Sequence, residues 1–393
     1  MLAALLVALA PPADWPQFLG PARDGVTPEV VPAWADKPAV AWKAPAGPAH
    51  SSPVVAGGVV FLFDQPPGVD ADRLSAFDLA TGKPLWSNKY ERDKYQPPFG
   101  EGPRGTPAVA GGKVYTLGGT GVLACWDAAG GKVLWTRDTL ADFKAPNLTF
   151  GVSGSPLVHA GRVFVNVGGK GAGLVAFDAA TGKTAWQATD DGASYSSPVV
   201  AGGRVVFLSK RRLVAVDPAD GAVRWEHPFQ DLLQESATAP LAAGDLVVGS
   251  SVTLGSVALK PGDGDKPAVA WKSPLLNCYF STPVQAGDQL YMLNGVLSIT
   301  PSITLRCVDA ATGKVRWERK NVGKYHAALV RTGDNKLLML DDNGRLTLFA
   351  ADPTGYKELA GSPVCGPTWA HPAVAGGFVV VRDENEVVAL KLK

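Results

Sequence analysis

Cysteine, histidine and charge are all scarce in this sequence. Its 393 residues include 4 cysteines and 5 histidines, and only 19% of the residues are charged. Four cysteines, no two of them adjacent, do not make a disulfide scaffold for a chain of this length. The net charge of +1, without any basic run, argues against nucleic acid or an anionic membrane surface as the main partner.

Long apolar segments are missing as well. Residues 1–10 are apolar but too few to cross a bilayer, and Pro11-Pro12-Ala13 follows them. We therefore expect residues 1–13 to form a signal peptide that lacks the usual positive start, with a buried N-terminal segment as the alternative. Such a signal predicts a periplasmic or secreted protein of the bacterial cell envelope. No later stretch is apolar enough to span a membrane. The lack of a cysteine before Cys125 predicts no lipid anchor.

Common catalytic motifs are absent too. The sequence contains no Gly-x-Ser-x-Gly, no His-Glu-x-x-His and no Gly-x-x-x-x-Gly-Lys-Ser/Thr. These patterns carry the nucleophile of hydrolases, the metal ligands of zinc proteases and the phosphate-binding backbone of P-loop proteins. The motifs therefore predict no enzyme of these classes.

Glycine (45) and proline (32) are abundant, and the glycines recur at matching places in a repeat. Its clearest copy is Ala176-Phe-Asp178-Ala-Ala-Thr181-Gly182-Lys-Thr-Ala-Trp186. Asp and Thr side chains can bond the backbone of such a turn, while glycine takes the left-handed conformation. Near copies end at Trp86, Trp135, Trp225 and Trp317.

Each repeat also begins in a common way, most often with Ser/Thr-Pro, apolar residues and a Gly-Gly or Gly-Asp link. Alternating apolar residues on both sides of such a link predict a hairpin, because glycine accepts the positive φ angles of its turn. A third strand then ends at the Asp and a fourth at the Trp. The repeats open at Ser52, Thr106, Ser155, Ser197, Ala239, Thr282, His326 and His371. Four strands in every 42 to 54 residues are typical of a propeller blade.

The two ends of the chain share the last blade. The eighth unit, residues 371–391, stops after three strands, and residues 36–45 have the sequence of a missing fourth strand. We therefore predict an all-β, eight-bladed propeller of four-stranded antiparallel blades over residues 36–393, closed by pairing of the N-terminal strand with the last blade. Residues 14–35 are expected to be an extension packed on the propeller. We also expect a monomer in which all cysteines are free.

Seven tryptophans share one register on the fourth strands. They could form a stacking platform for a ligand, or wedges between blades that bury about 150 to 250 Å² per ring. Their uniform position on the outer strand favours the wedge, and Leu359 replaces the tryptophan of the seventh unit. The seven are Trp42, Trp86, Trp135, Trp186, Trp225, Trp271 and Trp317.

At these residues the sequence resembles the PQQ-like eight-bladed β-propeller repeat family, through the motif Ala-x-Asp-x-x-Thr-Gly-Lys-x-x-Trp. That family contains the quinoprotein alcohol and glucose dehydrogenases and the non-enzymatic BamB-type propellers of outer-membrane assembly. The resemblance covers residues from about 36 to the end and implies the fold, whereas fold does not fix activity. For a dehydrogenase it would imply a vicinal cysteine pair, a Glu-Asn-Asp calcium site and a catalytic Asp. No residue of this sequence can be assigned to those roles.

The variable connections predict where a ligand would bind. The loops between second and third strands, and between blades, share one face and vary in length, and binding residues normally lie on such loops. The residue two places before each opening should face the channel mouth. These eight rim residues are His50, Arg104, Ser153, Tyr195, Ala237, Phe280, Lys324 and Trp369. The residues that we expect to bind a ligand are His50, Arg104, Tyr195, Lys324 and Trp369.

Three histidines should meet at this rim, because the seventh, eighth and first blades are neighbours in a closed ring. His50, His326 and His371 are therefore candidate ligands for zinc or copper. The alternative is that His326 and His371, which replace Ser or Thr, only bond to backbone. The carboxylates on nearby loops are expected to be solvated rather than catalytic. They are Glu101, Asp142 and Glu235.

Two functions remain open. The first is an exported, non-catalytic binding or scaffold propeller that engages a protein, a peptide or a small ligand through the variable loop face and uses no cofactor. The alternative is an oxidoreductase that depends on pyrroloquinoline quinone (PQQ) or a metal, with its site at the channel mouth.

Overall fold

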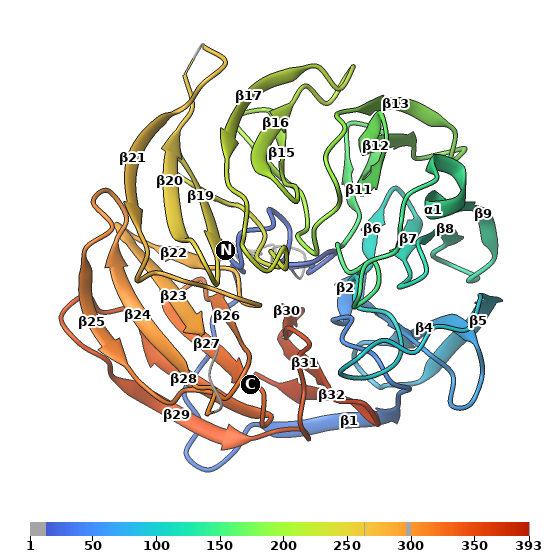
Figure 1. Cartoon of the computed structure of the whole chain (residues 1–393). Helices are drawn as coiled ribbons and strands as arrows, with labels where there is room; N and C mark the ends of the chain where they lie inside the picture. The colour runs from blue at the N-terminus through green and yellow to red at the C-terminus, as the bar shows by residue number, and fades with distance from the viewer. Residues whose placement is uncertain (1–12, 263, 296–299, 393) are drawn as a thin grey trace, which may run out of the picture.

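The computed structural model of the protein describes residues 13–262, 264–295 and 300–392. Residues 1–12, which include most of the predicted signal peptide, lie outside the described residues. Within these ranges, 32 strands form eight four-stranded sheets arranged in a ring (Figure 1). The prediction of an all-β, eight-bladed propeller is confirmed.

Each of the first seven blades uses four consecutive strands, numbered from the inner edge outward. Blade 1 contains β2 (Val54–Ala56), β3 (Val59–Asp64), β4 (Ala71–Asp78) and β5 (Pro84–Glu91). Blade 2 contains β6 (Ala108–Ala110), β7 (Lys113–Leu117), β8 (Val122–Asp127) and β9 (Val133–Asp138). Blade 3 contains β10 (Leu157–His159), β11 (Arg162–Gly169), β12 (Ala172–Asp178) and β13 (Thr184–Ala188). Blade 4 contains β14 (Val199–Ala201), β15 (Arg204–Leu208), β16 (Arg212–Val216) and β17 (Val223–Pro228).

The second half of the ring repeats this order until the last blade. Blade 5 contains β18 (Leu241–Ala243), β19 (Leu246–Ser251), β20 (Gly255–Lys260) and β21 (Ala268–Ser273). Blade 6 contains β22 (Val284–Ala286), β23 (Gln289–Gly295), β24 (Ile303–Asp309) and β25 (Val315–Arg319). Blade 7 contains β26 (Ala327–Arg331), β27 (Lys336–Asp341), β28 (Arg345–Ala350) and β29 (Glu358–Pro363). Blade 8 contains β30 (Ala373–Ala375), β31 (Phe378–Arg382), β32 (Glu386–Lys391) and β1 (Ala39–Pro45).

Strand β1 closes the ring as its sequence predicts. It pairs with β32 in antiparallel register, with Ala39 opposite Lys391 and Pro45 opposite Glu386. The described residues contain one helix, α1 (Thr139–Phe143), in the connection between blades 2 and 3. In these ranges no helix is long and apolar enough to cross a membrane.

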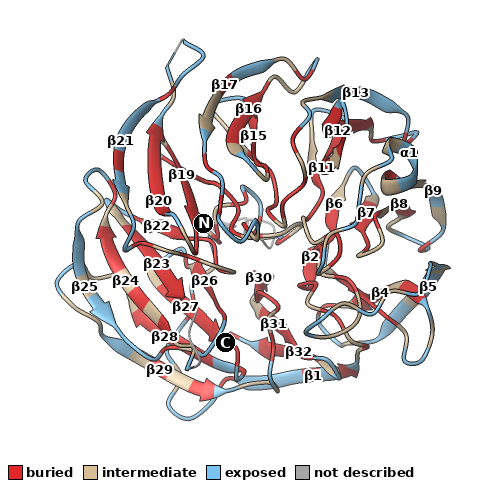
Figure 2. Ribbon diagram, viewed as in Figure 1, coloured by how far each residue is buried: buried red, intermediate tan, exposed pale blue. Residues whose placement is uncertain are grey.

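The apolar core lies between neighbouring blades and is formed mainly by their second and third strands. All residues of β15 and β16 except the first of each are buried, whereas no residue of the outer strand β5 is buried (Figure 2). One such cluster joins Phe164 and Leu174 of blade 3 to Val205 and Val214 of blade 4. Each blade face thus finds its apolar partner on the next blade, which is why a single blade cannot bury its own surface. All four cysteines are free, as expected.

The Asp-x-x-Thr-Gly segments form tight turns between the third and fourth strands. In blade 1 the amide of Thr81 donates to Oδ1 of Asp78 at 2.8 Å, and Gly82 has a φ of 72°. The same amide bond recurs between Thr181 and Asp178 at 2.8 Å. The hydroxyl of each threonine donates to the same oxygen, at 2.6 and 2.7 Å. The hydroxyl bond, and after it the amide bond, holds the pKa of each aspartate below the usual value, because both bonds stabilise the carboxylate.

The tryptophans of the outer strands reach across to the turn of the next blade. Six indole Nε1 groups donate to a carbonyl there: for Trp186 the acceptor is Pro218, at 3.1 Å. The Trp186 ring also lies directly over Gly221, where an added Cβ would be 2.6 Å from Cε3 of the indole. The glycine therefore serves two purposes, since it accepts a positive φ and leaves room for the ring of the preceding blade.

Residues 14–27 cross the centre of the ring against the inner strands (Figure 1). The chain then runs along blade 7 to its outer strand, where Nε1 of Trp34 donates to the hydroxyl of Ser362 at 3.0 Å. Trp15 is buried and exchanges two backbone hydrogen bonds with Val55 of blade 1, at 2.8 and 2.9 Å. Further along, the amide of Thr27 donates to the carbonyl of Arg331 in blade 7, and its hydroxyl donates to the carbonyl of Val374 in blade 8. This segment thereby connects blades that are far apart in the sequence.

Arg23 anchors the middle of the same segment. Its guanidinium is buried and donates to the carbonyls of Ser155 and Pro198, at 3.3 and 2.8 Å, and to Oε1 of Gln17 at 3.0 Å. Burial lowers the pKa of Arg23 to about 9, because the charged form is removed from water. The carbonyl groups of blades 3 and 4 supply the acceptors that a buried arginine requires.

A comparison of two glycines tests the packing of tryptophan over the turn. Gly221 and Gly202 both have a positive φ, 76° and 55°, but a Cβ on Gly202 would meet nothing within 4 Å. In both alanine variants the free energy of unfolding should fall by about 1 to 2 kcal/mol, because alanine disfavours the left-handed backbone conformation. Gly221→Ala should lose a further 1 to 3 kcal/mol, roughly, because it must displace Trp186. Urea unfolding measures both losses of stability. Equal losses would show that the indole of Trp186 can move away from the added methyl group at no cost in free energy.

Candidate functional site

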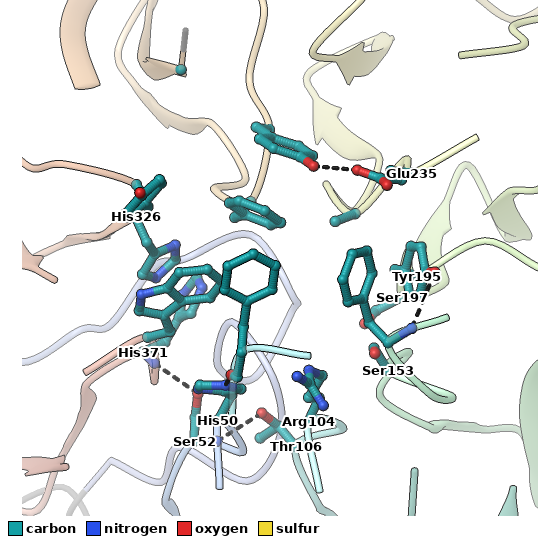
Figure 3. Close-up of a pocket in the computed structure, with 18 of the residues that line it drawn as sticks. His50, Ser52, Arg104, Thr106, Ser153, Tyr195, Ser197, Glu235, His326 and His371 are labelled. Atoms are coloured by element: carbon teal, nitrogen blue, oxygen red, sulfur yellow. Dashed lines mark hydrogen bonds between the residues drawn. The ribbon is translucent and has the colours of Figure 1, made fainter. Parts of the chain in front are cut away.

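A cavity of about 300 Å³ lies at the channel mouth, on the face that carries the connections between blades. The eight rim positions deduced from the repeat all line it, one from each blade. They are His50, Arg104, Ser153, Tyr195, Ala237, Phe280, Lys324 and Trp369. His326 and His371 line it as well (Figure 3). The structure thus brings every candidate binding and metal-ligating residue to one place.

Aromatic rings form a large part of the cavity wall. Trp369 lies at their centre, with its ring centroid 5.0 Å from Phe280, 5.3 Å from His50 and 6.4 Å from Phe99. The rings of Tyr279 and Phe280 stack on each other at 3.7 Å. Flat rings at these separations make a surface that suits another aromatic or apolar group.

Five of these aromatic residues escaped the sequence prediction. Tyr279 and Tyr325 adjoin the rim positions 280 and 324 in the chain, so the repeat register could have indicated them. Phe99 and Phe150 lie in long connections whose paths the sequence does not define. Phe18 comes from the segment that crosses the ring, and its ring meets that of His371 edge-on at 5.1 Å. No signal in the sequence places residue 18 here.

Among the described residues, three charged side chains also line the cavity. Arg104 donates to the carbonyl of Pro98 at 2.8 Å, and partial burial lowers its pKa. The ammonium of Lys324 lies 5.0 Å from the centre of the Tyr325 ring. We expected Glu235 to be solvated, but it is half-buried in the wall and accepts a hydrogen bond from the hydroxyl of Tyr279.

The other two loop carboxylates lie outside this cavity lining. Asp142 pairs with Arg137 at 2.6 Å. Glu101 accepts weak bonds from Gln65 and Gln96, at 3.3 and 3.4 Å. Neither carboxylate therefore faces the aromatic wall.

Hydroxyl groups join the blades below the aromatic wall. The amide of Ser52 donates to the hydroxyl of Thr106 at 3.1 Å, that of Thr106 to Ser155 at 3.0 Å, and that of Ser155 to Ser197 at 2.8 Å. Blades 5 and 6 are joined in the same way, as are blades 8 and 1. We call this series the hydroxyl belt. It explains why most repeats open with Ser or Thr.

Two of the remaining junctions in the belt use a neighbouring serine. Where Ala239 lacks a hydroxyl, Ser196 donates to the carbonyl of Thr238 at 2.7 Å. Where His326 stands at the opening, Ser281 donates to the carbonyl of Ala327 at 2.5 Å. Between blades 7 and 8 the described residues show no equivalent bond, and the rings of His326 and His371 lie 5.3 Å apart there.

Asp342 fixes the segment that carries His326. Its carboxylate accepts the backbone amides of Lys324, Tyr325 and His326, at 3.0, 2.6 and 3.3 Å. The carboxylate comes from the connection between β27 and β28. Three bonds to one side chain hold the rim residue Lys324, its neighbour Tyr325 and His326 in a defined position.

The three histidines are close together, but their arrangement does not resemble a metal centre. Nε2 of His50 lies 2.7 Å from the carbonyl of Phe99, so that nitrogen is already engaged. Among the described residues no three side chains of His, Cys, Asp or Glu are grouped so as to hold a metal ion. The three-imidazole metal site is therefore not formed in this structure. The ring nitrogens of His326 and His371 also make no bond to backbone within those residues.

Comparison with known proteins assigns a family to this architecture. The sequence model of the family described as "Outer membrane protein assembly factor BamB" matches residues 70–319. This chain belongs to the BamB family. A curated BamB-family relative, the outer membrane protein assembly factor BamB of Moranella endobia (strain PCIT), is 26% identical over 247 residues. The match spans 56% of this chain and 60% of that relative.

Solved structures related to this BamB-family chain include both enzymes and an assembly factor. The quinohemoprotein alcohol dehydrogenase of Comamonas testosteroni has a TM-score of 0.68 at 15% identity, over 96% of this chain and 80% of its own. BamB of Moraxella catarrhalis has a TM-score of 0.63 at 15% identity, over 89% of this chain and 98% of its own. At such identities the likeness shows a shared fold alone.

The cavity of this BamB-family chain does not fit a quinone site of the dehydrogenase type. The resemblance implies a vicinal cysteine pair and a calcium site, but the four cysteines are separated and free. Glu235 is the carboxylate in the cavity lining, and it is bonded to Tyr279. Among the described residues, the cavity lining therefore offers no free carboxylate of the kind that calcium sites use.

The histidines of the cavity predict acid sensitivity. Burial lowers the pKa of His371 to about 4 and that of His326 well below 6.5, while burial and the charge of Arg104 lower the pKa of His50 to about 4. Unfolded histidines titrate near 6.5, so between pH 6.5 and 4 the unfolded chain binds protons that the folded chain does not. The stability contributed by these neutral histidines is complete above pH 6.5 and is lost as the pH falls.

We therefore expect the free energy of unfolding to drop between pH 7.5 and pH 5, by about 2 kcal/mol from His371 alone. Urea unfolding at both pH values measures the drop. His371→Gln removes the titrating group and should show a correspondingly smaller drop than the unmodified protein. An unchanged pH dependence in that variant would contradict the assignment.

Proposed function

We propose that this BamB-family propeller is a non-catalytic binding protein of the cell envelope that holds a segment of a protein partner on its loop face. The observation that carries the proposal is the aromatic cavity, which combines an apolar wall with a few polar groups and lies where the connections of all eight blades meet. The family description and the Moranella relative both name outer membrane protein assembly. We therefore place the partner among the proteins involved in that process.

Exposed apolar side chains around the cavity support a protein partner. Phe99 in the cavity wall is 68% exposed, Leu232 is 78% exposed and Leu275 is 69% exposed. Leu232 lies in the connection that carries Glu235, and Leu275 lies in the connection that carries Tyr279. Large exposed apolar residues gathered around a concave site are typical of interaction surfaces.

A photo-crosslinking amino acid placed on the loop face tests this proposal. Benzoylphenylalanine at position 232 should form an adduct with a protein of the outer membrane or its assembly apparatus. The same amino acid at Leu85, which is 49% exposed on the outer strand β5, serves as the matched control and should form none. The measurement is mass spectrometry of adducts formed in intact cells, where the full envelope is present.

The adduct at position 232 should weaken when Trp369→Ala removes the central ring of the cavity wall. Equal adducts from positions 232 and 85 would contradict a partner site on the loop face. Purified protein that gains dye-linked alcohol oxidation on addition of PQQ and Ca²⁺ would contradict the non-catalytic role.

A further inference from the structure

The junction between blades 7 and 8 leaves two ring nitrogens without a partner. At the other junctions of the belt a hydroxyl bonds to the neighbouring blade, whereas His326 and His371 meet here. Nε2 of His326 and Nδ1 of His371 are buried and have no hydrogen-bond partner among the described residues. Both rings line the cavity (Figure 3). Each nitrogen has less than 1 Å² of accessible surface, so a ligand in the cavity reaches it only when the ring turns to present it. An unpaired buried polar atom costs about 1 to 3 kcal/mol, so a ligand that satisfies the nitrogen favours that turn.

The surroundings of His326 define its tautomer. Nδ1 lies 3.4 Å from the hydroxyl of Ser281, and that hydroxyl donates its one hydrogen to the carbonyl of Ala327 at 2.5 Å. Ser281 can therefore only accept from His326. We assign the proton to Nδ1 on this ground, which makes Nε2 an acceptor, since burial keeps the ring neutral. A ligand that satisfies it must supply an O–H or N–H group.

The wall around this acceptor selects a flat ring. The centroid of Trp369 is 6.4 Å from that of His326, and Phe18 contacts His371 edge-on at 5.1 Å. Phe280 and Phe99 continue the wall on the other sides of Trp369. A ring inserted among them gains aromatic contacts in addition to its apolar burial. A cavity of about 300 Å³ has room for one such side chain.

We propose that Nε2 of His326 accepts a hydrogen bond from the phenol hydroxyl or indole N–H of a tyrosine or tryptophan side chain that the partner inserts into the cavity. The inference rests on the proposed function, because the ring belongs to the partner protein. His326 and its blade-8 neighbour His371 then act as specificity residues: they distinguish an aromatic ring that carries a donor from one that does not.

Two small molecules of nearly the same shape test the chemistry in the unmodified protein. p-Cresol and p-xylene differ by a hydroxyl in place of a methyl group. A wholly apolar cavity should prefer p-xylene, because p-cresol would bury its hydroxyl unpaired. With the acceptor in place, titration calorimetry should instead show p-cresol binding about three- to tenfold more tightly. Equal binding, tighter binding of p-xylene or binding of neither compound would overturn the proposal.

A histidine variant then locates the acceptor. His326→Phe keeps a ring of similar size but removes Nε2, so the preference for p-cresol should disappear or reverse. His227→Phe, on strand β17 and outside the cavity lining, is the matched control and should keep the preference. Loss of the preference in both variants, or its retention in His326→Phe, would overturn the role of His326. The comparison of ligands in the unmodified protein remains decisive if His326→Phe does not fold.

Short peptides test whether the ring that binds belongs to a protein side chain or to a free small molecule. Acetyl-Gly-Tyr-Gly-amide should bind more tightly than its phenylalanine counterpart, by the same three- to tenfold factor. Preference for p-cresol without binding of the tyrosine peptide would overturn the assignment to a partner side chain and indicate a free small molecule. A further outcome separates the two proposals. If the tyrosine peptide is preferred but positions 232 and 85 give equal adducts, the loop face is not the site where the partner binds. The cavity would then still recognise an aromatic ring that carries a hydrogen-bond donor.

Discussion

The structure depends on a contact that six of the eight blades make with the next one. A tryptophan on the outer strand donates to a carbonyl of the following blade, as Trp186 does to Pro218, and its ring occupies the space above a turn glycine such as Gly221. Near the axis, the hydroxyl belt joins neighbouring blades by a second route. Because every blade needs both neighbours, the ring is stable only when it is closed, and β1 provides that closure.

These contacts also explain why the fold could be predicted from the sequence while the site could be predicted only in part. The repeat fixes the turn at Gly182 and the strand that ends at Trp186, so counting units gave the number of blades. The same register located rim residues such as Arg104 and Trp369, because it determines which residue precedes each inner strand. It could not predict the path of the long connections, which bring Phe99 to the same wall.

Non-local contacts explain the remaining differences. Phe18 reaches the cavity because its segment crosses the whole ring, and no local pattern encodes that path. Glu235 faces the cavity because Tyr279 of the next connection lies opposite it. His326 and His371 occupy positions where other repeats have Ser or Thr, so the sequence identified them as exceptions. Whether they would bind a metal or bond to backbone depended on ring orientations that only the structure shows.

The segment that crosses the ring has a consequence for how the protein is made. Thr27 bonds to Val374, which follows it by 347 residues, and Arg23 bonds to carbonyls more than 130 residues away. Contacts at such separations form slowly, because a long loop must close before they gain any energy. The segment is made before the blades that it contacts, yet it is among the last parts of the chain to reach its final place. Until then Phe18 is missing from the cavity wall, so the wall is completed only in the final steps of folding.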